Sequence, residues 1–370
     1  MQVTRLAVAG LRRFDQAELL PAAGLNLIYG DNGAGKTSLL EALHLMAYGR
    51  SFRGRVREGL MRTGREAVEV FVEWQETASP RLRRAGLRHT GQNWTGRLDG
   101  ESVSQLGELC AALAVVSFEP GSHALVTGTG EPRRRFVDWG LFHVEQDFLN
   151  RWRRYARALK QRNALLKSGA PERQLDAWDH ELADSGEPLT ERRQQYLEQL
   201  QFQLQAVAGE LVPSLGEASL GFQPGWRRSE VSLADALLLA RERDRSLGYT
   251  TQGPHRADWK VQYASLAPGE TLSRGQAKLT ALSCLLAQAQ DYARRRGEWP
   301  VIALDDLASE LDRRHQRRVL DRLVASGAQV FITGTEVPPG LDPATRPGAL
   351  FHVEQGQVQR LEPQAPSGPA

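Results

Sequence analysis

The chain has 370 residues, of which 41% are hydrophobic and 25% are charged. Single hydrophobic cores seldom grow to this length, so the sequence favours two packed domains. The composition is that of a globular protein and excludes a chain dominated by disorder. The net charge is +3, and nearly all of the 47 basic residues are arginines. Arginine suits contacts with phosphate oxygens, although composition alone does not decide a function.

Membrane and secretory signals are absent from the sequence. No stretch approaches eighteen consecutive apolar residues, and the first residues, MQVTRLAVAGLRRF, lack the apolar core of a secretory signal. We therefore expect a cytoplasmic protein that has no membrane partner. The cysteines, Cys110 and Cys284, each lie in an apolar stretch. We expect both to be reduced core residues, forming neither a disulfide nor a metal site.

The first third of the chain alternates strands with glycine-rich turns. Strands are predicted at residues 3–8, 25–29, 68–74, 81–88, 93–98 and 112–118, and a helix at residues 36–48. A strand, a glycine-rich turn and a helix in succession form the usual setting of a phosphate-binding loop. The alternating segments between residues 68 and 98 predict antiparallel strands.

The middle of the chain has a different residue pattern, with long polar runs and few glycines. Apolar residues recur there at three- and four-residue intervals, which predicts helices packed on one another. After residue 253 strands and helices alternate again, with helices predicted at 276–294 and 313–325 and strands at 301–304 and 329–333. The sequence thus predicts a head made of residues 1–130 and 250–362, a helical lobe of residues 131–249 and a disordered tail of residues 363–370.

Residues 30–37 match the phosphate-loop pattern G-x-x-x-x-G-K-[ST] at every fixed position. The predicted binding residues are Gly30, Asp31, Asn32, Gly33, Ala34, Gly35, Lys36 and Thr37. Glycines let backbone amides surround a phosphate, and the following helix adds favourable partial charge. Lys36 is expected to contact the β- and γ-phosphates of ATP, and Thr37 to ligate Mg²⁺. The alternative is a glycine-rich turn that matches by chance.

The strand at residues 301–304 ends in Asp305 and Asp306, the form of a Walker B strand. Asp305 is expected to hold Mg²⁺, and Asp306 to polarise the attacking water. We therefore predict Lys36, Asp305 and Asp306 as catalytic residues. Taken alone, the two aspartates fit a helix cap equally well, and the phosphate loop decides between these interpretations.

The segment LSRGQ opens the predicted helix at residues 276–294. Ser273, Arg274, Gly275 and Gln276 are candidate nucleotide contacts, because a serine and a glycine at a helix start can present a hydroxyl and free amides to an anion. For an isolated LSRGQ, an ordinary helix cap without a ligand is the simpler interpretation.

The order of these segments resembles that in the head domains of ABC ATPases and their SMC-like relatives. The phosphate loop comes first, followed by LSRGQ, the strand with two aspartates and Ser309–Asp312. The resemblance implies that the signature helix of one copy covers the γ-phosphate held by another, so that ATP joins a homodimer. Ser309–Asp312 matches the D-loop of that interface. ABC transporter subunits normally carry a histidine after the next strand and a glutamate where Asp306 stands. These departures favour a slow, switch-like ATPase.

Further segments narrow the resemblance to the RecF family of bacterial recombination mediators. They lie at residues 11–14, 50–53, 133–138, 159–163 and 253–258, and the resemblance covers nearly the whole chain. It implies recombinational repair of gapped DNA, support of DNA replication at stalled forks and SOS induction, with RecR and RecO as partners. It also implies that Arg12 reaches the bound nucleotide.

Three arginine clusters, at residues 50–57, 133–135 and 151–162, are candidate DNA contacts. Phosphate neutralisation makes binding salt-dependent and largely independent of base sequence. For any single cluster, a solvated helix face paired with acidic neighbours is the simpler interpretation.

The sequence as a whole predicts an α/β fold, an ABC/SMC-type P-loop ATPase head interrupted by a helical lobe. We expect an ATP-dependent DNA-binding protein with weak DNA-dependent ATPase activity, whose ATP-joined dimer clamps DNA until hydrolysis releases it. The alternative function is a nucleotide-sensing assembly subunit that mainly recruits protein partners.

Overall fold

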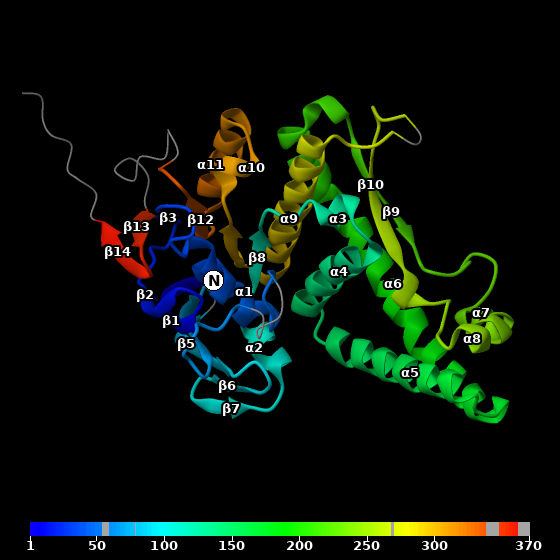
Figure 1. The fold of residues 1–370 in the computed structure, drawn as a ribbon. Coiled ribbons are helices and arrows are strands. Elements are labelled where there is room, and N and C mark those ends of the chain that lie inside the picture. The colour runs from blue at the N-terminus through cyan, green and yellow to red at the C-terminus, as the bar shows by residue number, and fades with distance from the viewer. Residues whose placement is uncertain (54–58, 78, 268–269, 338–347, 362–370) are drawn as a thin grey trace, which may run out of the picture. The chain divides into compact units, whose positions relative to one another are not determined.

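The computed structural model describes residues 1–53, 59–77, 79–267, 270–337 and 348–361 (Figure 1). The chain divides into two compact units, the first of residues 1–122 and 289–370 and the second of residues 123–288. The predicted boundaries of the head and the helical lobe stay predictions. The predicted tail at residues 363–370 lies outside the described residues.

The first unit contains a six-stranded antiparallel sheet with the strand order β2-β1-β4-β5-β6-β7. Side chains alternate between a buried and an exposed face, as the pattern of β4, buried at Val68, Val70, Val72 and Trp74, shows. The segments predicted as antiparallel strands therefore do pair in this way. The strand bounds are β1 (Gln2–Leu11), β2 (Phe14–Leu19), β4 (Val68–Glu76), β5 (Ser79–His89), β6 (Trp94–Leu98) and β7 (Glu101–Val103).

The second sheet of this unit is mixed, with the order β14-β13-β3-β12-β11-β8. Only the pairing of β13 with β14 is antiparallel, and the other pairings between described strands are parallel. Every residue of β11 and β12 is buried, which is typical of parallel strands covered on both faces. The bounds are β3 (Leu25–Tyr29), β8 (Val115–Phe118), β11 (Val301–Leu304), β12 (Val330–Gly334), β13 (Gly348–Glu354) and β14 (Gln357–Leu361).

Helix α1 (Lys36–Tyr48) lies between the two sheets and contacts β1 and β4 of one and β8 and β12 of the other. Its residues from Ser38 to Ala47 are all buried, so the helix forms the centre of the core of this unit. The start of α1 is thereby fixed against both sheets. Among the described residues, the other helices that lie wholly in this unit are α2 (Leu106–Ala112), α10 (Leu307–Glu310) and α11 (Arg313–Ser326).

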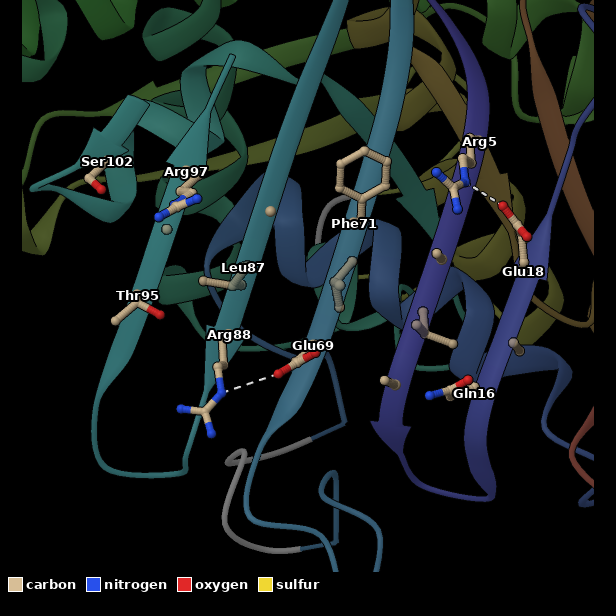
Figure 2. Close-up of a pocket in the computed structure, with 17 residues that line it drawn as sticks. Arg5, Gln16, Glu18, Glu69, Phe71, Leu87, Arg88, Thr95, Arg97 and Ser102 are labelled. Atoms are coloured by element: carbon tan, nitrogen blue, oxygen red, sulfur yellow. Dashed lines mark hydrogen bonds and ion pairs between the residues drawn. The ribbon is translucent and has the colours of Figure 1, made fainter. Parts of the chain in front are cut away.

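The exposed face of the antiparallel sheet carries a hollow of about 860 Å³ (Figure 2). Phe71, Gly86 and Arg97 lie side by side in it, on adjacent strands. Ion pairs on its rim join Arg5 to Glu18 and Arg88 to Glu69. None of the predicted nucleotide residues lines this hollow, so size alone does not locate the nucleotide site.

The second unit consists mainly of packed helices, together with an antiparallel pair of strands, β9 (Ala218–Gln223) and β10 (Asp258–Tyr263). The packing of helix on helix confirms the interpretation of the middle of the chain. Helix α5 packs along α6, which runs for 40 residues with Pro188 inside it. The helix bounds are α3 (Ala124–Thr127), α4 (Gly130–Val144), α5 (Phe148–Ser168), α6 (Glu172–Leu211), α7 (Leu233–Leu239) and α8 (Arg241–Leu247), and α9 (Arg274–Arg296) begins here and ends in the first unit.

Buried polar contacts hold the segment from Gly253 to Asp258 in the second unit. Arg133 forms a bidentate ion pair with Asp258, at 2.6 and 2.9 Å. His255 lies between the hydroxyl of Tyr155 (2.6 Å) and the carbonyl of Thr250 (2.9 Å), and burial lowers the pKa of His255 to about 4. The imidazole is therefore neutral at pH 7, and its Nε2 is the donor to Thr250.

No helix within the described part of the chain is long and apolar enough to cross a membrane.

Candidate nucleotide site

The phosphate loop joins β3 to α1, as predicted. Gly30 and Gly35 have φ values of 149° and 121°, a region that side chains rarely adopt. Space also requires glycine, since a Cβ on Gly30 would stand 2.1 Å from the carbonyl oxygen of Val353, and one on Gly35 2.8 Å from the ring of Phe14. No side chain caps the start of α1. Its first amides are thus free of a side-chain acceptor at the position where a helix binds an anion.

The ammonium group of Lys36 lies over its own loop. It donates to the carbonyl oxygens of Gly30 at 2.6 Å and Asp31 at 2.8 Å. Burial lowers the pKa of Lys36, while the nearby Asp306, Asp305 and Asp31 oppose this shift. An ammonium has three N–H donors, so one remains for a phosphate oxygen even when both carbonyl contacts are kept.

Three neighbouring strands bring the remaining groups together at their carboxyl ends. β12 pairs in parallel with both β3 and β11, so the residues that follow β3 and β11 meet across the end of β12. Thr37 donates to Asp305 Oδ1 at 2.8 Å, and Thr333 of β12 donates to the same oxygen at 2.7 Å. Burial raises the pKa of Asp305, and the hydrogen bonds from Thr333 and Thr37 lower it.

This arrangement fits a magnesium ion. Thr37 Oγ1 and Asp305 Oδ1 are 2.8 Å apart, close to the ~2.9 Å between adjacent corners of an octahedron with metal–oxygen bonds of ~2.0–2.1 Å. Within the described residues there is no group of three or more His, Cys, Asp or Glu side chains that suits a metal. Nucleotide-bound Mg²⁺ needs few protein ligands, because phosphates and water supply the others.

Asp306 follows Asp305 in the left-handed region, at φ 51° and ψ 43°. Its amide donates to Thr333 Oγ1 at 2.8 Å, so the Thr333 hydroxyl links the two aspartates. Its carboxylate accepts a hydrogen bond of 2.5 Å from Ser309, the first residue of the predicted D-loop. The role of Asp306 toward water stays a prediction, and its carboxylate already has a partner from the segment expected at the dimer interface.

Arg12 and Arg13 form the turn between β1 and β2, where Leu11 pairs with Phe14. Arg12 forms a bidentate ion pair with the buried Glu41 of α1, at 2.5 and 2.9 Å. Its contact with the nucleotide stays a prediction. Arg13, which was not singled out from the sequence, lies beside the loop, with its Nη2 3.6 Å from the point where a Cβ on Gly33 would stand.

The predicted signature segment forms the exposed start of α9 in the second unit. Ser273 Oγ accepts from the amide of Gln276 at 3.3 Å, and the Gln276 side chain accepts from the amide of Ser273 at 2.8 Å. Ser273 therefore does cap the helix, as the simpler interpretation predicted. The helix cap does not explain why residue 275 is a glycine, because a side chain would have room there: a Cβ on Gly275 would meet no heavy atom within 4 Å. That open space is compatible with close approach of another molecule.

Thr333 holds both aspartates, and we expect its replacement by valine to weaken binding of Mg²⁺ and ATP roughly 10-fold, about the worth of one hydrogen bond to a charged group. Removing its hydrogen bond raises the pKa of Asp305 further. A proton then competes with Mg²⁺ for Asp305 at a higher pH. The pH at which half of the binding is lost on acidification therefore rises. Titrations of Mg²⁺-ATP at several pH values measure both effects.

The controls for this prediction are Thr333→Ser, which keeps the hydroxyl, and Thr335→Val, which makes the same change at an exposed position of the same strand end. Both should bind Mg²⁺-ATP as the unmodified protein does. A Thr333→Val variant with unchanged affinity and an unchanged midpoint would show that Thr333 does not position Asp305.

The structure corrects part of the proposed DNA contacts. Arg133 and Arg162 are buried and ion-paired, so they do not face a DNA backbone. Arg134 donates to the carbonyl of Ala257, and Arg135 pairs with Glu131. In the cluster at residues 50–57, residues 54–57 lie outside the described residues. Arg153 and Arg157 of α5 are exposed and form no ion pair with a described acidic residue, so they remain candidates.

Comparison with known proteins shows the family to which the chain belongs. Residues 2–356 match the model of the RecF/RecN/SMC N-terminal domain family. The chain is 68% identical over 361 residues to the DNA replication and repair protein RecF of Stenotrophomonas maltophilia strain R551-3, covering 97% of this chain and 99% of the relative. A solved structure of the recombination mediator RecF with ATP, in the RecFOR pathway, is 25% identical with a TM-score of 0.87 and 98% of both chains covered.

A solved SMC head, bound to the C-terminal winged-helix domain of ScpA, has a TM-score of 0.60 at 14% identity, with 98% of both chains covered. This likeness confirms the predicted SMC-type head as a fold. The family match over almost the whole chain and the close relatives together show that the protein belongs to the RecF family of DNA replication and repair proteins.

Proposed function

We propose that this protein is an ATP-dependent DNA-binding protein of recombinational repair, in which ATP joins two copies into a clamp on gapped DNA or at stalled forks. Mg²⁺-ATP would occupy the phosphate loop, with Thr37 and Asp305 on the metal. Slow hydrolysis, with Asp306 acting on water, would release the clamp. Such a protein supports DNA replication and SOS induction. The ATP and the RecFOR pathway named for a solved relative support this proposal, and make RecO and RecR the expected partners.

The observation that carries the proposal is the meeting of Lys36, Thr37, Asp305 and Asp306 at adjacent strand ends. A site of this kind binds the polyphosphate from one side and leaves the γ-phosphate open to a second contact. The exposed start of α9, with unfilled space beside Gly275, supports a second copy as the source of that contact. ATP would then act as part of the interface.

Replacement of Ser273 by arginine tests the dimer directly. We expect ATP affinity to change less than twofold, since Ser273 would contact the nucleotide held by the other copy, and the ATP-dependent dimer to be lost. Sedimentation velocity with and without ATP, in the presence of gapped DNA, measures the association. Ser232→Arg is the matched control, because Ser232 is likewise an exposed helix cap, accepting from Asp235 at 3.1 Å.

A Ser273→Arg variant that still dimerises with ATP would refute contact through the signature segment. The alternative function, a nucleotide-sensing assembly subunit that mainly recruits protein partners, predicts a different pattern. DNA affinity would then be the same with and without ATP, whereas the clamp requires that affinity rises with ATP and falls with salt.

A further inference from the structure

Helix α5 has an unusual charge composition. Its 21 residues, FLNRWRRYARALKQRNALLKS, contain seven basic side chains and no acidic one. Two of the seven are neutralised by other elements. Arg162 is buried against Asp179 and Asp244, and Arg154 pairs with Glu181 and Asp184. The helix therefore presents uncompensated positive charge at its surface.

Four exposed cations of α5 form one line, which we call the α5 stripe: Arg153, Arg157, Lys160 and Lys167. Their spacings of four, three and seven residues keep them on one side of a helix. With a rise of ~1.5 Å per residue, the stripe is ~21 Å long. No ion pair joins any of the four to a described acidic residue. A line of separate positive charges matches a chain of phosphates better than it matches a compact anion.

A groove of about 540 Å³ lies beside the stripe, between α5 and α6. Arg153, Arg154 and Arg157 line it from α5, and Ala177, Trp178 and Glu181 line it from α6. The carboxylate of Glu181 already accepts two hydrogen bonds from Arg154, at 2.6 and 2.8 Å. Glu181 thus compensates Arg154, and the groove combines an indole ring with two further arginines, Arg153 and Arg157, that form no ion pair with a described acidic residue.

We propose that the α5 stripe and the Trp178 groove bind single-stranded DNA, with the phosphates along the stripe and an unpaired base against Trp178. The inference rests on the proposed DNA-binding function and names the surface and strand form that function uses. A single strand fits better than a duplex, because the bases of a duplex are already stacked and unavailable to an indole in a groove. Aromatic platforms beside basic lines are how single strands are bound without sequence preference.

Neutralising the stripe tests the phosphate contacts. The variant Arg153→Gln/Arg157→Gln/Lys160→Gln should bind a 20-nucleotide oligothymidylate, in the presence of ATP, with a slope of log affinity against log salt that is less steep by roughly 2, at ~0.7 per phosphate lost. The control variant Arg227→Gln/Arg243→Gln/Lys260→Gln removes the same charge from exposed positions elsewhere in the second unit. It should leave the slope unchanged.

Replacing Trp178 tests the base contact. Trp178→Ala should weaken oligothymidylate binding by roughly 5- to 150-fold, the range for one stacked base, and leave affinity for a blunt duplex unchanged. Trp178→Phe keeps an aromatic face and should retain most of the affinity. Phenylalanine also keeps an apolar side chain at this half-buried position, so it separates stacking from folding.

The outcomes distinguish this inference from the proposed function. If the unmodified protein binds DNA only with ATP but the stripe variant keeps its salt slope, the surface is wrong and the function stands. If the unmodified protein shows no ATP-dependent DNA binding, the proposed function is wrong, and this inference, which rests on it, is wrong with it. A stripe variant that binds DNA normally but loses a protein partner such as RecR would overturn the DNA assignment in favour of a protein surface.

Discussion

Replacement of Lys36 by methionine is expected to lower ATP affinity by roughly 100-fold or more, because ATP would exchange with one loop carbonyl and the expected contacts of the ammonium with the β- and γ-phosphates, ~1.5–3 kcal/mol each, would be lost. In the structure the ammonium is held over the phosphate loop by the carbonyls of Gly30 and Asp31. Methionine fills a similar length without charge or donors. Dimerisation should fail with ATP binding, and equilibrium nucleotide binding together with sedimentation at saturating ATP measures both.

Lys260→Met is the matched control, since it makes the same substitution on an exposed position of β10. We expect ATP affinity and ATP-dependent dimerisation of that variant to equal those of the unmodified protein. Thermal unfolding of the Lys36 variant checks that the loop change leaves the fold intact. Normal ATP affinity in a folded Lys36→Met variant would show that the nucleotide binds somewhere other than this loop.

The parts of the nucleotide site that are contiguous in sequence were predictable. The loop from Gly30 to Thr37 is read from eight successive residues, and Asp305 from the buried strand before it. Thr333 was missed because its importance depends on strand order. Only the placement of β12 between β3 and β11 brings its hydroxyl to both aspartates. A sequence pattern does not tell which strands become neighbours in the sheet.

The secondary structure was predictable where periodicity was strong. The predicted bounds for β3, α1 and β11 agree with the structure, and those for α9 and α11 differ only at their ends. The edge strand β14 was missed, since its sequence QVQRL has few apolar residues to fix a period. It forms because β13 offers it a paired neighbour and not because of its own composition.

Arginine was the residue type that the sequence placed least well. Counting charges put Arg133, Arg154 and Arg162 together with the other candidate DNA contacts, because sequence carries no direct record of burial. The structure separates them by what each guanidinium meets. Arg162 and Arg154 lie on the same helix and each meets two carboxylates, yet the side chain of Arg162 is 0% exposed and that of Arg154 is 49% exposed.

This difference predicts a large effect on stability. Arg162→Met should lower the free energy of unfolding by ~3–5 kcal/mol, because it leaves the buried Asp244 without its arginine and the buried Asp179 with one arginine in place of two. Asp244 would lose the donor at 2.6 Å, and Asp179 would keep Arg241, which donates to it at 2.6 Å. Urea unfolding followed by tryptophan fluorescence measures the change, as a shift of the midpoint at constant slope.

Arg154→Met is the matched control on the same helix, and should cost less than ~1 kcal/mol because water solvates the exposed carboxylates that it leaves. Adding Asp244→Asn to Arg162→Met should recover part of the loss, since it removes the uncompensated charge, and the double-mutant cycle gives the coupling energy. Equal destabilisation by Arg162→Met and Arg154→Met would refute the argument from burial. With burial as the cause, Arg162 is a structural residue of the second unit, and the DNA contacts proposed for this helix are left to the exposed cations of the α5 stripe.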